Sequence, residues 1–144
     1  MSTLDAVLQA KANLEIAEAA AGRELQAKKQ KELRDLRAQG RTLDRQITAQ
    51  ATEVRRLRQQ AEPLWARLPA LQREQRQLEE AGPGDFPSDE EIDAHADQLK
   101  RLEAELQQNT NQRTELSTLI ARAERTLNDL TAQRKLLLWQ IEQV

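Results

Sequence analysis

One cluster in the chain carries the side-chain types of a metal site. Asp93, His95 and Asp97 alternate with alanines, and His95 is the only histidine. If this segment is a helix, residues two positions apart point in widely different directions, so three ligands cannot converge on one ion. We therefore predict no metal site here and assign His95 to a polar position in a helix–helix seam.

The rest of the sequence offers no other catalytic set. The chain has no cysteine, so it lacks a thiol nucleophile and a cysteine metal site. Gly82-Pro83-Gly84 is not followed by the Lys and Ser or Thr of a phosphate-binding loop. Two long helices also enclose no pocket in which a nucleophile and its base could meet. We predict a protein that is not an enzyme and binds no cofactor or metal.

The composition of the 144 residues is typical of long helices. Charged residues make up 32% of the chain and aromatic residues 2%. Apolar side chains recur in heptads, at positions a and d, from Leu33 to Leu78 and again from Ile92 to Val144. Pro63 and Pro69 lie on the outer face of the first stretch, where we expect a kink rather than a break.

A single segment, residues 82–88, has the glycines and prolines of a turn. Ser88 and Glu91 form a capping box, in which the hydroxyl and the carboxylate can each accept a hydrogen bond from a free amide. The sequence thus predicts an all-α fold, a long antiparallel two-helix coiled-coil hairpin with an N-terminal helical overhang. Its parts are an overhang at 1–22, a first arm at 23–81, the turn at 82–88 and a second arm at 89–144.

The turn also predicts how the two arms face each other. A turn centred on Asp85 pairs residues whose numbers add up to 170. The pairs include Leu78 with Ile92, Gln75 with His95, and Gly40 with Leu130. Arg113 and Arg134 then fall in the seam and must extend their guanidinium groups outward. A register with the sum 163 fits the seam equally well, but it would unwind the first helix as far as Leu78.

Two apolar surfaces have no partner in this hairpin. The overhang carries its own apolar stripe, and the end of the second arm is apolar nearly all round. Burying these surfaces together would remove both from water, and closed two-fold dimers are the commonest oligomers. We expect a homodimer through this end of the hairpin. The candidate self-association residues are Leu4, Val7, Leu14, Leu136, Leu138 and Trp139.

Charge is unevenly distributed although the net charge is only −2. Residues 23–76 hold fourteen basic and seven acidic side chains, whereas residues 77–93 hold seven acidic and no basic ones. A basic surface of this kind can bind a phosphate backbone, or it can be the solvated exterior of a coiled coil. The candidate phosphate contacts are Arg41, Arg45, Arg55, Arg56 and Arg58.

Phe86, the only phenylalanine, lies in the turn among carboxylates. It is a candidate contact for a partner at the tip. Alternatively it folds over Leu78 and Ile92 and covers the end of the seam, and we favour this second interpretation.

The leading functional hypothesis is a non-enzymatic scaffold or adaptor, a coiled-coil hairpin that binds itself and a protein partner whose identity the sequence leaves open. The alternatives are a nucleic-acid-binding rod with a basic shaft, and a stalk or chaperone of a secretion or motor complex. In architecture the hairpin resembles the stalk proteins of flagellar and type III export ATPases and the tRNA-contacting arm of seryl-tRNA synthetases. No apolar run approaches the roughly 18 residues of a membrane span, so we expect a soluble, cytoplasmic protein without membrane contact.

Overall fold

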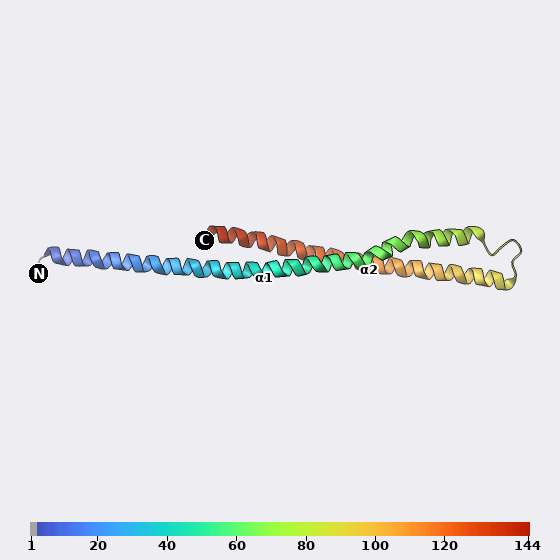
Figure 1. Cartoon of the computed structure of the whole chain (residues 1–144), viewed down its shortest axis with the longest axis horizontal. Helices are drawn as coiled ribbons and strands as arrows, with labels where there is room; N and C mark the ends of the chain where they lie inside the picture. The colour runs from blue at the N-terminus through green and yellow to red at the C-terminus, as the bar shows by residue number, and fades with distance from the viewer. Residues whose placement is uncertain (1–2) are drawn as a thin grey trace. The chain divides into compact units, whose positions relative to one another are not determined.

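The computed structural model describes residues 3–144 and contains two helices, α1 (Thr3–Ala81) and α2 (Asp89–Gln143) (Figure 1). No β-strand occurs within this range. The two helices pack against each other, so the predicted all-α helical hairpin is confirmed. Met1 and Ser2, the first residues of the predicted overhang, lie outside the part that the structure describes.

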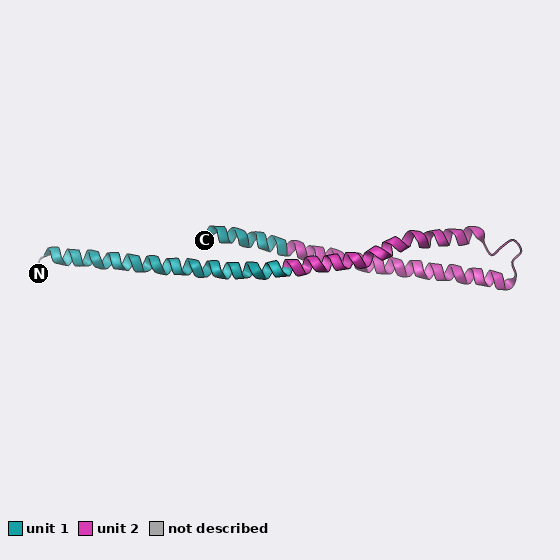
Figure 2. Cartoon of the chain, in the orientation of Figure 1, with its two compact units in different colours: residues 1–46, 130–144 teal, residues 47–129 magenta. Residues whose placement is uncertain are grey.

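The chain divides into two compact units (Figure 2). The first unit combines the part of α1 that ends at Gln46 with Leu130–Val144 at the end of the chain. The second unit, Ile47–Asp129, contains the rest of α1, the connecting segment and most of α2. Each unit therefore contains one segment of α1 and one segment of α2, and only in the first unit do these segments come from distant parts of the sequence.

Burial in the second unit follows the predicted heptads. Val54, Leu57 and Ala123 form its central apolar cluster. Three partly buried residues of α2 pack against this cluster, namely Leu116, Ile120 and Leu127. Every one of these residues occupies an a or d position, because only those positions return to the same side of both helices.

The first unit is held by a shorter stretch of the same seam. Leu137 is buried in it, and a Cβ atom at Gly40 would lie 3.5 Å from Cδ2 of Leu137. Arg134 occupies an a position, yet its side chain is exposed and its Nε donates a 2.5 Å hydrogen bond to Oδ1 of Asp44. The expected outward extension of this arginine is thus present.

The register differs from the predicted one by one heptad. Gly40 lies against Leu137 rather than Leu130, and Val54 shares its cluster with Ala123. Both pairs have residue numbers that add up to 177. The reason lies in the connection: Figure 1 shows the start of α2 reaching past the end of α1, so residues 82–88 do not form a symmetric turn. Ile92, expected in the seam opposite Leu78, is 45% exposed as a result.

Helix α1 passes without interruption through Gly22, Pro63 and Pro69. The absence of a break at the prolines agrees with their place on the outer face, where a lost backbone hydrogen bond does not disturb the seam. Residues 3–22 also belong to α1, so the helix does not reverse at Gly22. Apart from Ala20, all residues from Thr3 to Glu32 are exposed, so the segment without a helical partner extends beyond residue 22.

Candidate functional site

The connection between the helices is fixed by caps at both ends. Gly82 adopts a left-handed conformation (φ 62°), and its amide donates a 3.1 Å hydrogen bond to the carbonyl oxygen of Leu78. This is the usual glycine cap of a helix C-terminus. At the start of α2, the amide of Glu91 donates to Oγ of Ser88 (3.2 Å), as predicted. The Glu91 carboxylate accepts a hydrogen bond from the Ser88 hydroxyl and not from a backbone amide.

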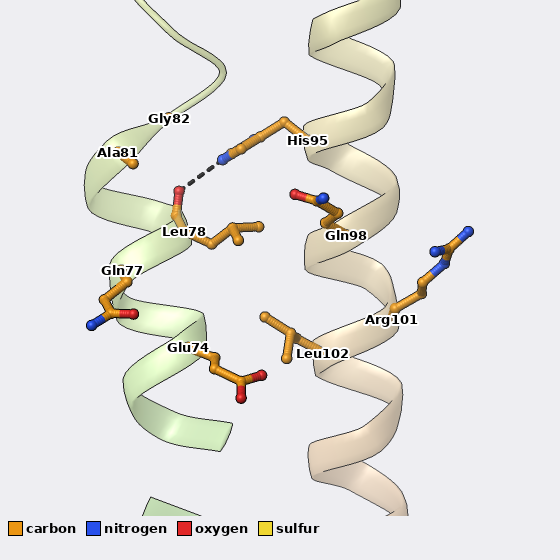
Figure 3. Close-up of a pocket in the computed structure, with 9 residues that line it drawn as sticks. All are labelled: Glu74, Gln77, Leu78, Ala81, Gly82, His95, Gln98, Arg101 and Leu102. Atoms are coloured by element: carbon orange, nitrogen blue, oxygen red, sulfur yellow. Dashed lines mark hydrogen bonds between the residues drawn. The ribbon is translucent and has the colours of Figure 1, made fainter. Parts of the chain in front are cut away.

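His95 ties the two helices together beside this cap. Its Nε2 lies 2.7 Å from the carbonyl oxygen of Leu78 (Figure 3). A carbonyl oxygen can only accept, so Nε2 carries the hydrogen and donates it. The side chain is half-buried in the seam, as expected, although it contacts Leu78 instead of Gln75. Asp93, Asp97 and His95 do not come together, and residues 3–144 contain no group of side chains that could hold a metal ion.

A shallow pocket of about 550 Å³ lies next to His95. Figure 3 shows Leu78 of α1 and Leu102 of α2 pointing into the space between the helices, with the Glu74 carboxylate beside them and the Arg101 side chain extending away from this space. The pocket contains no nucleophile with an adjacent base.

Phe86 does not cover the end of the seam. Its side chain is 98% exposed, so the favoured interpretation, a cap over Leu78 and Ile92, is wrong. An aromatic ring held in water by a structured turn is unfavourable for the free protein. Phe86 therefore remains a candidate contact at the tip, within a segment, residues 77–93, that holds seven carboxylates and no basic side chain.

The first unit carries most of the large apolar side chains that are exposed. More than half of the surface of Leu4, Val7, Leu14, Leu136 and Trp139 is exposed, and Leu138 is only slightly more covered. Leu8, Ile16 and Leu25 are exposed to a similar extent. The neighbouring Leu137 is buried, which confirms that one helical face of this segment packs in the seam while the others stay open.

Several of the candidate phosphate contacts already have partners. Arg56 donates hydrogen bonds of 2.9 and 2.5 Å to the carboxylate of Glu53. These bonds hold the pKa of Glu53 below its usual value and raise the pKa of Arg56. Arg58 pairs with Glu124 of α2, and Arg45 contacts the hydroxyl of Thr42. Arg41 and Arg55 make no ion pair within the described chain, so the five arginines do not act as one uncompensated surface.

The structure reveals a site that the sequence analysis missed. Arg113, expected to extend away from the seam, places its Cζ atom 4.6 Å from the centre of the Trp65 ring. The two residues line an open groove of about 550 Å³ in the second unit, together with Arg122 and Arg125. The signal was present, because Trp65 occupies an e position beside the seam, but its partner can be identified only when the register is known.

No protein-family model, curated protein or solved structure matches this chain. None of the described helical segments is both long and apolar enough to cross a membrane.

Proposed function

We propose that this chain is a non-enzymatic coiled-coil scaffold or adaptor that associates with itself through its first unit. The observation that supports this proposal is the exposed apolar surface of that unit, formed by the start of α1 and the end of α2. Exposed apolar patches of this kind on a charged, helical protein mark contact surfaces. Self-association gives the start of α1 an apolar partner and does not involve the tip of the hairpin.

The apolar side chains at the start of α1 are arranged for packing against another helix. Leu4, Val7 and Leu14 recur at spacings of three and seven residues and so share one face, which is the pattern of a helix contact. Gln9 and Asn13 lie on another face, where they are hydrogen-bonded to each other at 3.2 Å. The polar face provides a matched control for the apolar one.

The nucleic-acid hypothesis for residues 41–58 is less well supported than self-association. Arg56 and Arg58 are paired with carboxylates, and each such pair would have to break before the arginine could bind a phosphate.

Light scattering during gel filtration tests the proposed self-association. We expect a mass of twice the 16.5 kDa chain for the wild type. Val7→Glu/Leu14→Glu should shift this species towards the monomer, because two carboxylates would be buried without partners. Gln9→Glu/Asn13→Glu adds the same charge on the other face and should leave the mass unchanged. A wild-type monomer, or equal loss in both variants, would contradict the proposal.

A further inference from the structure

The groove beside Trp65 has the chemistry of a binding site for an anionic partner. Arg113, Arg122 and Arg125 line it, and no carboxylate is among its lining residues. The Trp65 side chain is 53% exposed even though Arg113 lies over its ring. The groove therefore offers positive charge and an aromatic surface side by side.

The charges of these three arginines are not neutralised by the chain itself. Arg113 donates to Oδ1 of Asn109 (2.6 Å) and to the hydroxyl of Thr110 (3.1 Å), which are both neutral. Across residues 3–144, no ion pair involves Arg122 or Arg125. Glu124, their neighbour in sequence, is paired with Arg58. A partner of this groove should thus supply carboxylates or phosphates.

The tip of the same hairpin has the complementary chemistry. Phe86 is 98% exposed, and Asp85 precedes it in the connecting segment. Asp89 and Glu90 follow at the start of α2, where both are exposed. No lysine or arginine occurs between Gln77 and Asp93. The tip therefore presents an aromatic ring among negative charges, as the groove presents one among positive charges.

The tip and the groove of one chain cannot meet. Asp89 and Ser117, which mark the two sites on α2, are separated by 28 residues of continuous helix within the second unit. At 1.5 Å per residue this is a distance of about 42 Å. We propose that the acidic, Phe86-bearing tip of one chain docks in the Trp65 groove of a second copy. Two hairpins placed side by side in opposite directions make this contact twice, related by a two-fold axis.

Two alternatives, another docking site for the tip and another occupant of the groove, explain less of the structure. The pocket beside His95 is the other docking site, but an acidic tip bound there would meet the like charges of residues 77–93. Single-stranded nucleic acid could pair with the arginines and stack on Trp65, yet the groove supplies one exposed ring only, and Phe86 would remain without a partner. The second copy accounts for both exposed aromatic residues and for both charge patches.

Charge reversal provides a test that no general loss of stability can imitate. The tip variant is Asp85→Lys/Glu90→Lys, and the groove variant is Arg122→Glu/Arg125→Glu. In a dimer of two copies of the same variant, both tip–groove contacts bring like charges together, so each variant alone should no longer associate. An equimolar mixture of the two variants restores opposite charges in both contacts, so it should associate again.

The measurement is sedimentation velocity at low salt, with the two variants carrying different fluorophores. All chains contain Val7→Glu/Leu14→Glu, which keeps the contact independent of the self-association proposed for the first unit. In chains that carry Val7→Glu/Leu14→Glu, the further change Phe86→Ser should weaken the tip–groove association about tenfold, as expected for a central aromatic anchor. Lys28→Glu/Lys31→Glu reverses the same charge outside the groove and should have no comparable effect. Circular dichroism confirms that each variant is folded.

The proposal is overturned if either variant alone associates as well as its parent, or if the mixture stays monomeric. A labelled oligodeoxythymidine identifies the competing occupant. Oligonucleotide binding that disappears in Arg122→Glu/Arg125→Glu, while the mixture fails to associate, would assign the groove to nucleic acid and also reject the second copy. Failure of the first-unit dimer would leave these outcomes unchanged.

Discussion

His95 of α2 and the carbonyl oxygen of Leu78 of α1 are joined by a 2.7 Å hydrogen bond at the tip of the hairpin. The same carbonyl accepts the amide of Gly82 at 3.1 Å, so both of its lone pairs are used. The Leu78 carbonyl at the end of α1 is therefore satisfied by the glycine cap of its own helix and by a side chain of the opposite helix. The contact links the last turn of α1 to the second turn of α2, close to the connecting segment.

Removal of the His95 side chain should weaken the hairpin. We expect His95→Ala to lower the free energy of unfolding by about 1 kcal/mol relative to Gln98→Ala, because one hydrogen bond to a helix terminus is lost. Gln98 is an exposed neighbour on α2, and both variants gain the same helix-favouring alanine. Urea unfolding followed by circular dichroism measures the difference. Equal stability of the two variants would show that the bond contributes nothing.

The register can be checked by disulfide formation, since the chain has no cysteine of its own. Val54→Cys/Ala123→Cys places two thiols in the central cluster of the second unit and should form a bond within one chain under mild oxidation. Ile47→Cys/Ala123→Cys is the pair that a turn centred on Asp85 would bring together, and it should oxidise much more slowly. Non-reducing electrophoresis and mass spectrometry distinguish the two. Faster disulfide formation by the Ile47→Cys/Ala123→Cys pair would contradict the observed register and support the one predicted from a turn centred on Asp85.

The sequence predicted the seam well and its register badly, for one physical reason. Heptad spacing determines which side of each helix is buried, and among the a and d positions from Leu33 to Val144 only Ile92 and Arg134 are exposed. A shift by seven residues, however, leaves every a and d position in the seam. The energy difference between two such registers rests on a few contacts, such as Gly40 with Leu137, and on the path of the connecting segment.

The candidate sites also divide into those that follow from the heptad pattern and those that depend on the register. Exposure of Leu4, Leu136 and Trp139 could be foreseen, because no heptad partner exists for them. The groove beside Trp65 could not, because it depends on which residue of α2 lies opposite an e position of α1. Once the register places Arg113 there, the cation–aromatic contact and the two further arginines one turn apart become recognisable.

Leu71 and Ile92 should respond very differently to truncation although both occupy seam positions in the heptad pattern. Leu71 has no exposed surface, so Leu71→Ala should lower the free energy of unfolding by about 2 to 4 kcal/mol through the lost contacts and the cavity. Ile92 is 45% exposed beyond the end of α1, and Ile92→Ala should cost less than about 1 kcal/mol. Chemical unfolding of both variants provides the comparison. Similar losses would mean that α1 covers Ile92 in solution.

Replacement of a glycine by alanine should change stability in opposite directions at Gly40 and Gly82. Gly40 lies within α1, where alanine is favoured over glycine by about 1 kcal/mol, and its new methyl group would make an ordinary contact with Leu137 at 3.5 Å. Gly82 has a φ of 62°, a conformation that costs a residue with a Cβ atom about 1 to 2 kcal/mol.

We therefore expect a higher urea midpoint for Gly40→Ala and a lower one for Gly82→Ala, with unchanged slopes. A Cβ atom at Gly82 would meet nothing within 4 Å, so steric crowding cannot explain a loss there, and only the backbone conformation can. Gly82→Asn is the matched control, because asparagine tolerates the left-handed region better than alanine and should recover part of the stability. If Gly82→Ala were as stable as the wild type, α1 would not end in a left-handed glycine cap in solution.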